Sequence, residues 1–286
     1  MTATMGRESV GTPLMRRAFV APLAVGLLGV TISMIGITIP SLWYDEAATV
    51  SSTTRSLPQL WAELGNVGAV HGLYYLLMHV IFEVFGYSPL SLRMPSAIAV
   101  GIATALVVVL GRQVNRPRLA VIAALVFCLI PRVTWMGTEG RSYAMTATLA
   151  VLATVVLLRA IRTATPGAWI LYALVTLVSI ATFIYLALIV VAHAVTMVLL
   201  LRERTRRSRS NARNWLIAAA AAGLASLSFA AEVVSQSGQL SWTKPLNLGP
   251  IRGVLRSQWF YSSEPFAIAA WAFILVGLVM LLLSLR

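Results

Sequence analysis

FVAPLAVGLLGVTISMIGITI, residues 19–39, is followed almost at once by LWYDEAATVS, residues 42–51. The first stretch has no charged residue and matches the roughly 20 apolar residues that cross the hydrocarbon core of a bilayer as a helix. The second stretch holds Asp45, the only aspartate of the chain, next to Glu46. This order predicts a transmembrane helix whose exit carries two acidic side chains.

The composition of the whole chain excludes a soluble domain. Of its 286 residues, 59% are hydrophobic and only 11% are charged, which is too little polar side chain to cover a globular surface. Apolar runs of membrane-spanning length recur along the sequence. We predict an all-α integral membrane protein, a single transmembrane domain over residues 1–286 with about eight transmembrane helices, at 19–39, 95–112, 118–136, 143–160, 168–184, 185–201, 215–232 and 266–284.

The charges sort by side of the membrane when these spans alternate in direction. Fifteen of the 22 Lys and Arg residues fall on the side of the N-terminus, and seven of the nine acidic residues fall on the other side. An excess of Lys and Arg marks cytoplasmic loops, so we predict a multi-pass plasma-membrane protein with a cytoplasmic N-terminus. The net charge of +13 then requires no nucleic acid partner. The single cysteine, Cys128, excludes an intrachain disulfide.

The first outer segment, residues 40–94, is too long to be a simple connector. Its stretches 56–64 and 71–86 have the pattern of amphipathic helices that lie in the membrane interface. Above them we expect Asp45 and Glu46 on an extended or turn segment, where adjacent side chains point in different directions. A carboxylate at the lipid boundary is suited to act as a general base. The alternative is an acidic pair that simply opens a helix.

Polar residues form a second outer cluster within residues 131–145. Glu139, Arg141 and Tyr143 lie at the outer ends of two spans that a short turn joins, and Arg93 lies at the start of the second span. The planar guanidinium group matches the geometry of phosphate oxygens. Snorkelling at the membrane interface explains any one of these arginines equally well.

The outer loop 233–265 is a third candidate wall of the same site. Its polar side chains are suited to contacts with a donor phosphate or sugar, and they include Lys244, Arg252 and Gln258. The alternative is a covering loop that interfacial tryptophans anchor to the membrane.

Together these residues resemble the motifs of one known superfamily. The order is the Asp-Glu pair after the first span, HGLYYLLM (71–78), FGYSPLSLRMPSAI (85–98) and EGRSYAM (139–145). Over residues 20–160 the chain resembles the GT-C superfamily of polyprenyl-phosphate-sugar-dependent glycosyltransferases. Within it, the chain is most similar to the protein O-mannosyltransferase and aminoarabinose-transferase branch and its actinobacterial relatives. The prolines that usually follow the family histidine are Gly72 and Leu73 here.

The resemblance implies an enzyme that transfers a sugar, mannose or another hexose or pentose, from a polyprenyl phosphate to an extracytoplasmic acceptor with inversion. It implies that Asp45 is the general base and that Glu46, as a second catalytic residue, helps to place the acceptor or a divalent ion. Arg93 and Arg141 would contact the donor phosphate. Substrate-positioning roles fall to the other matched residues, His71, Glu139 and Tyr143.

The expected partners are the lipid-linked sugar, the bilayer and an acceptor that is a glycolipid, a polysaccharide or a protein. This chemistry requires no cofactor, although His79 and Glu83, four residues apart, leave a divalent cation as an alternative. Two other functions stay open, a transporter or flippase of lipid-linked sugars and a non-catalytic membrane subunit of a cell-envelope assembly. Relatives commonly have further spans, so a domain truncated after Arg286 is also left open.

Overall fold

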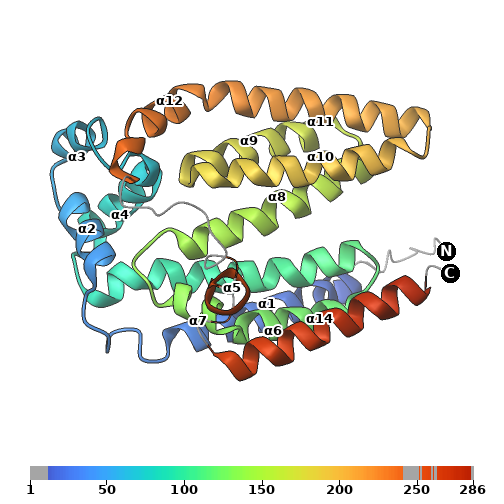
Figure 1. The fold of residues 1–286 in the computed structure, drawn as a ribbon, viewed down its shortest axis with the longest axis horizontal. Coiled ribbons are helices and arrows are strands. Elements are labelled where there is room, and N and C mark those ends of the chain that lie inside the picture. The colour runs from blue at the N-terminus through green and yellow to red at the C-terminus, as the bar shows by residue number, and fades with distance from the viewer. Residues whose placement is uncertain (1–11, 241–250, 252, 259, 261–262, 285–286) are drawn as a thin grey trace, which may run out of the picture.

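A computed structural model describes residues 12–240, 251, 253–258, 260 and 263–284, and these residues form helices without a strand (Figure 1). The α-helices are, in chain order, α1 (Thr12–Met34), α2 (Tyr44–Thr53), α3 (Leu57–Leu64), α4 (Gly72–Phe85), α5 (Pro89–Gln113), α6 (Pro117–Leu129), α7 (Pro131–Gly137), α8 (Tyr143–Thr163), α9 (Pro166–Thr182), α10 (Ala187–Leu201), α11 (Arg206–Ala225), α12 (Leu227–Ser235) and α14 (Glu264–Ser284). Short 3₁₀ and π-helical turns connect them, namely η1 (Ala69–His71), η2 (Ile184–Leu186), η3 (Ser237–Leu240) and η4 (Val254–Gln258). The predicted all-α class is confirmed.

Helix α5 is the centre of the bundle and packs against α1, α6, α7, α8 and α4. Its inward side chains, among them Leu92, Val100 and Val108, are fully buried. The backbones of α1 and α5 meet at two glycines, because a Cβ on Gly101 would lie 2.8 Å from the carbonyl oxygen of Gly26. Such close approach by small residues is how membrane helices gain packing contacts, since the lipid is as apolar as the helices.

The described helices occupy all eight of the predicted spans. Among the described residues, three helices are individually long and apolar enough to cross a membrane, namely α5, α8 and the unit of η2 with α10. The count rises to five if each of two bent helix pairs is one span. Helices α1, α9 and α14 and the unit of η1 with α4 are apolar over shorter lengths. The protein is therefore a membrane protein, and the number of eight crossings stays a prediction.

Two predicted spans are broken rather than continuous. Residues 118–136 fold as α6 and α7, which meet at 65°, and residues 215–232 fall across α11 and α12, which meet at 48°. Pro131 lacks the backbone N–H that a continuing helix requires, and its ring clashes with the preceding turn. At the second break, the hydroxyl of Ser226 donates to a carbonyl one turn back, a bond that favours bending.

The first outer segment contains the two predicted short helices, α3 and α4. The side chain of Gln59 accepts the backbone N–H of Ser56 at 3.2 Å, and Pro58 lies in the first turn of α3. The segment also contains α2, whose first turn holds Asp45 and Glu46, as in the alternative of an acidic pair that opens a helix. The extended or turn conformation predicted for this pair is wrong, although the two side chains do face different surroundings.

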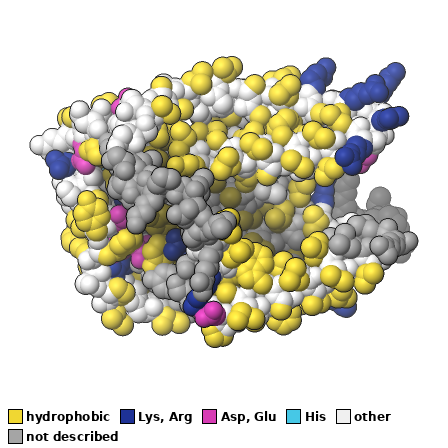
Figure 2. All heavy atoms as spheres, viewed as in Figure 1, with side chains coloured by type: hydrophobic (Ala, Val, Ile, Leu, Met, Phe, Trp, Pro, Cys, Tyr) yellow, Lys and Arg dark blue, Asp and Glu magenta, His cyan; other side chains and the backbone are white. Residues whose placement is uncertain are grey.

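The two ends of the bundle differ in charge. The start of α1, the end of α14 and the α10–α11 turn lie at one end, and α2, α3 and α4 lie at the other (Figure 1). Figure 2 shows Lys and Arg side chains projecting where α10 and α11 meet, while acidic side chains lie mostly toward the opposite end. This separation agrees with the predicted topology, in which the basic end is cytoplasmic.

Gly101→Val is expected to push α1 and α5 apart. The new side chain would meet Gly26 and Val30, and overpacking of this kind costs about 1–3 kcal/mol. We expect a lower melting temperature for the detergent-solubilised protein, measured as loss of the size-exclusion peak after heating. Gly223→Val in α11 is the control, because a Cβ there meets nothing within 4 Å. Equal melting temperatures for the two variants would contradict the packing role of Gly101.

Candidate active site

A buried ion pair between Glu46 and Arg93 fixes the segment that follows α1. The Nε and Nη2 groups of Arg93 donate to the two carboxylate oxygens of Glu46 at 2.7 and 2.6 Å, and both side chains are at most 2% exposed. The backbone N–H of Gly140 donates to the same carboxylate at 2.8 Å. The pair therefore joins α2, α5 and the turn 138–142 that precedes α8.

All five N–H groups of Arg93 have acceptors within the protein. Besides Glu46, these are the carbonyl oxygens of Ile37, Pro40 and Ser41, at 2.8, 2.9 and 3.3 Å. These contacts favour a structural role for Arg93, and its predicted contact with the donor phosphate stays a prediction. The carboxylate of Glu46 is fully buried against Arg93, which likewise favours a structural role, and its predicted role in placing the acceptor stays a prediction.

Asp45 lies beside this ion pair and is partly exposed. The hydroxyl of Tyr143 donates to Oδ2 of Asp45 at 3.4 Å. The Nη1 group of Arg141 donates to the backbone carbonyl of Asp45, also at 3.4 Å. The structure thus brings together Asp45, Arg141 and Tyr143, and it leaves the Asp45 carboxylate outside the buried ion pair.

Arg141 is a buried cation that forms no ion pair with a carboxylate of the described residues. The residue is 6% exposed. Its Nη1 group donates to the hydroxyl of Tyr75 at 3.0 Å, its Nη2 group donates to Nε2 of His71 at 2.9 Å, and its Nε has no partner. A buried charge is costly when no opposite charge compensates it. The arrangement around Arg141 is therefore suited to receive an anion.

Arg141 holds His71 in its neutral form. A guanidinium group has only donors, so Nε2 of His71 accepts and the ring proton is on Nδ1. Burial, together with the positive charge of Arg141, lowers the pKa of His71 to about 3. The ring stacks on Phe183 with a centroid distance of 6.3 Å and an interplanar angle of 13°. Two buried groups nearby, Nδ1 of His71 and the hydroxyl of Tyr74, have no hydrogen-bond partner among the described residues.

Glu139 lies buried in the turn 138–142, and its carboxylate accepts the indole N–H of Trp43. Burial, partly offset by this hydrogen bond, raises the pKa of Glu139 to about 7, and the neighbouring charge of Glu46 adds to the increase. The hydroxyl of Ser96 donates to the backbone carbonyl of Glu139 at 2.6 Å and fixes the turn on α5. Glu139 is therefore not a solvent-facing acid but a buried partner of Trp43.

One known family matches more than half of this chain. The family described as dolichyl-phosphate-mannose-protein mannosyltransferase matches residues 72–231. The chain belongs to this family. Membership supports a GT-C glycosyltransferase of mannosyltransferase type and implies a lipid-linked sugar donor. No curated protein and no solved structure matches the chain.

The family match covers a different range from the predicted resemblance over residues 20–160. It includes the E-x-R-x-Y element but neither Asp45 nor His71. It continues past residue 160 through α9, α10 and α11 and into α12, where the sequence analysis found only a general helical pattern. The second half of the bundle is thus part of the transferase fold of this family.

The possible metal ligands His79 and Glu83 lie on α4. His79 donates from Nδ1 to the backbone carbonyl of Thr53 at 3.0 Å, and Glu83 is exposed. Within the described ranges, no group of three His, Cys, Asp or Glu side chains could hold a metal ion. Outside the described part of the chain lie Lys244, Arg252 and the side chain of Gln258.

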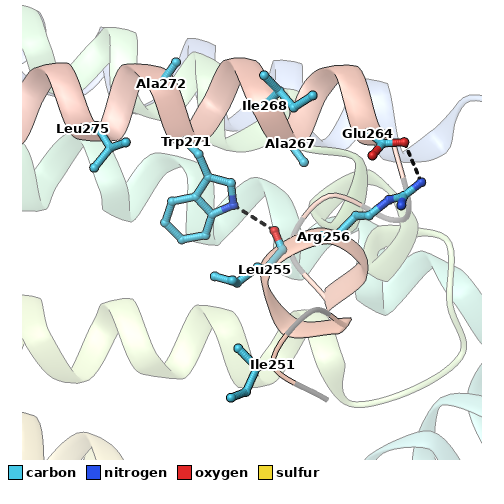
Figure 3. A pocket seen from close by; sticks show the side chains of 9 residues that line it. All are labelled: Ile251, Leu255, Arg256, Glu264, Ala267, Ile268, Trp271, Ala272 and Leu275. Carbon is cyan, nitrogen blue, oxygen red and sulfur yellow. Dashed lines mark hydrogen bonds and ion pairs between the residues drawn. The ribbon is translucent and has the colours of Figure 1, made fainter. Parts of the chain in front are cut away.

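The described part of the loop 233–265 makes polar contacts with α14. Arg256 forms an ion pair with Glu264 at 2.9 Å, and the indole N–H of Trp271 donates to the carbonyl of Leu255 at 2.8 Å (Figure 3). These residues line a mostly apolar pocket of about 680 Å³. A role for this loop as a wall of the site stays a prediction.

Sequence analysis missed residues that connect the site to the bundle. The side chain of Gln236, just after α12, accepts the backbone N–H of Ala69 at 3.0 Å and donates to the carbonyl of Leu64 at 2.9 Å. It thereby ties the end of α12 to the segment that carries His71. The four-residue spacing from His71 to Tyr75 signalled that they share a face, but no sequence signal marks Gln236.

Glu46→Gln is expected to destabilise this transferase strongly, because it leaves the charge of Arg93 buried and uncompensated. Breaking a buried ion pair from one side costs about 3–5 kcal/mol. Thermal unfolding of the solubilised protein measures the loss. Arg55→Gln is the control, because Arg55 pairs with Glu63 while its own side chain is 47% exposed, and such pairs contribute roughly 0–1 kcal/mol. Similar stability of the two variants would count against the structural role of Glu46.

Glu139→Gln is expected to change how stability depends on pH. Folding raises the pKa of Glu139 from 4.5 to about 7, so the folded state favours the protonated acid. The raised pKa therefore stabilises the folded protein fully below pH 4.5, and this stabilisation is lost as the pH rises through 7. The loss in free energy of unfolding is about 3 kcal/mol at most. His71 acts with the opposite sign, because its pKa is lowered.

The quantity to measure is therefore the melting temperature of the wild type minus that of Glu139→Gln, at each pH. His71 is present in both proteins, so its effect cancels. The difference should fall steadily between pH 4.5 and pH 7. A difference that is constant over this range would contradict the protonated state of Glu139.

Proposed function

We propose that this protein is a glycosyltransferase that moves a sugar, mannose in the first instance, from a polyprenyl phosphate to an acceptor hydroxyl on the outer side of the plasma membrane. The observation that carries the proposal is that Arg141, a buried cation without an ion pair among the described residues, donates to the backbone carbonyl of Asp45, whose own carboxylate is partly exposed. Sugar transfer requires both, a base for the acceptor and positive charge for the leaving phosphate.

In the proposed reaction, Asp45 takes the proton of the acceptor hydroxyl while the hydroxyl oxygen forms a bond to the anomeric carbon of the sugar. The bond between that carbon and the phosphate oxygen breaks, and the lipid phosphate leaves with the electron pair. Attack from the face opposite the phosphate inverts the anomeric configuration. Tyr143, which donates to Asp45, orients the carboxylate, and Arg141 stabilises the negative charge that grows on the phosphate.

Unused hydrogen-bond donors support a phosphate at Arg141. The Nε of Arg141, Nδ1 of His71 and the hydroxyl of Tyr74 are all buried without a hydrogen-bond partner among the residues that the structure describes. A buried polar group that stays unpaired costs about 1–3 kcal/mol. Phosphate oxygens are acceptors, so a bound phosphate satisfies such groups and compensates the buried positive charge at the same time.

An apolar groove supports a lipid-linked donor. Helices α4, α5, α8 and α9 line a cavity of about 740 Å³ whose walls are almost wholly apolar, and Tyr74 and Ile98 are among the lining residues. Thr182, at the same groove, directly precedes Phe183, which stacks on His71. An isoprenoid chain in this groove would carry its phosphate toward the His71 end.

The acceptor in this proposal is a hydroxyl of a glycolipid, a polysaccharide or a protein. The predicted positive-inside topology favours the outer side for the end that carries α2, α3 and α4. The proposed reaction uses no metal ion, because the Arg141 guanidinium provides the positive charge for the leaving group.

Asp45→Asn is expected to abolish sugar transfer without affecting membrane insertion. An amide cannot accept the hydroxyl proton, and loss of general-base catalysis lowers rates by about 10²–10⁴-fold. Membranes that contain the wild type or the variant are incubated with a panel of radiolabelled polyprenyl-phosphate sugars, and the labelled products are identified. The panel also identifies the sugar and the acceptor.

Glu83→Gln is the matched control, since it removes an exposed acid from the same outer segment. This control should transfer sugar at the wild-type rate. Transfer by Asp45→Asn at that rate would exclude Asp45 as the base. If the wild type transferred sugar from no member of the panel, the proposed function itself would be wrong.

A further inference from the structure

Trp43 has an exposed ring with a fixed orientation. The residue is 41% exposed, yet its indole N–H donates to the buried carboxylate of Glu139. Its ring also packs on Trp135, with centroids 6.3 Å apart and planes at 60°. The extended backbone of Trp43, which immediately precedes α2, places this ring two residues before Asp45.

Aromatic rings continue from Trp43 to the Asp45 carboxylate. Trp135 stacks on Tyr143, with centroids 5.5 Å apart and planes at 27°. The guanidinium of Arg132 lies 4.0 Å from the centroid of the Trp135 ring and adds a cation–π contact. Since Tyr143 donates to Asp45, the exposed ring of Trp43 is held at the border of the proposed reaction centre.

Anchoring in the membrane interface does not account for this arrangement. Tyr44 and Trp61, in the same outer segment, are 86% and 68% exposed. Neither side chain makes a hydrogen bond or ring contact with another residue of the described part of the chain. An interfacial anchor requires no fixed ring plane, whereas Trp43 is held by a buried acid and a second indole.

We propose that the ring of Trp43 is a stacking platform for a sugar ring beside Asp45. This inference rests on the proposed function and adds a sugar-binding subsite to it. A pyranose presents an apolar C–H face that packs on an aromatic ring, while its hydroxyl groups find acceptors in carboxylates such as Asp45. The stacked sugar belongs either to the donor or to a saccharide acceptor, and both present the same face.

The rigidity of Trp43 adds to its affinity for a sugar. A ring that is already oriented loses little conformational freedom when a ligand stacks on it. Well-placed aromatic contacts contribute about tenfold in affinity. We therefore expect removal of the ring to weaken sugar binding about tenfold and to leave binding of the lipid phosphate unchanged.

Two variants of Trp43 isolate the contribution of the ring. Trp43→Phe and Trp43→Leu both remove the indole N–H that donates to Glu139, so both variants remove the same hydrogen bond. Only Trp43→Phe keeps an aromatic ring. Tyr44→Leu is the control, since it removes an exposed aromatic side chain that makes no hydrogen bond or ring contact with the described residues. All variants are made in the full chain and compared after solubilisation in detergent.

Binding of a short-chain polyprenyl phosphate and of the same lipid carrying mannose is measured by calorimetry. The dissociation constant of the polyprenyl phosphate divided by that of the mannosylated lipid reports the contribution of the donor sugar. Measuring this ratio requires no turnover. KM for methyl mannosides as acceptors is measured separately. If the donor sugar stacks on Trp43, the ratio falls about tenfold in Trp43→Leu and stays near the wild-type value in Trp43→Phe and Tyr44→Leu.

If instead an acceptor saccharide stacks there, the ratio is unchanged and KM for the mannosides rises about tenfold in Trp43→Leu alone. Either result supports the platform and identifies its ligand. A Trp43→Leu protein with the wild-type ratio and the wild-type KM would overturn the inference while leaving the transferase function intact. Loss of the proposed function would show differently, as failure of the wild type to bind the polyprenyl phosphate or to transfer its sugar.

Discussion

The buried ion pair between Glu46 and Arg93 is the interaction on which the arrangement of the site depends. Neither charge can remain in an apolar interior without the other, so the segments that carry them must dock together. Arg93 also holds three carbonyl groups of the chain that leaves α1, and Glu46 holds the N–H of Gly140. A Cβ on Gly140 would meet the side chain of Leu92, so this turn lies directly on α5. Together these contacts determine where Asp45 lies.

Residues of one type take different roles here because their surroundings differ. Asp45 and Glu46 are neighbours in one helical turn, yet Glu46 is buried against a cation and Asp45 is partly exposed beside a tyrosine hydroxyl. Arg93 and Arg141 are both buried as well. Every N–H of Arg93 has an acceptor, including a carboxylate, whereas Arg141 has neutral partners and an unpaired Nε. Arg93 therefore has no free N–H donor for a ligand, whereas Arg141 has a donor that could bind an anion.

The sequence carried enough information for the helical membrane class, for the short helices of the first outer segment and for the grouping of Asp45 with Arg141 and Tyr143. The first two features follow from hydrophobic periodicity, which is a local property of the chain, and the grouping follows from the order of motifs that resemble the GT-C superfamily. The partner of Arg93 is 47 positions away, and no local pattern distinguishes an arginine that binds a carboxylate from one that binds a ligand. The tie between Gln236 and Ala69, which are 167 positions apart, depends on packing between distant helices in the same way.

The unpaired donors around Arg141 are tolerable only because other contacts keep the site in place. A histidine N–H and a tyrosine hydroxyl without partners would favour local rearrangement if the surrounding backbone were free to move. Here the turn before α8 is held by Glu46, the hydroxyl of Ser96 and the close contact of Gly140 with α5. His71 is held by Phe183 and by the segment that Gln236 ties to α12. Donors whose positions are fixed by such contacts are the kind of preorganised group that can stabilise developing negative charge, as the proposed function requires.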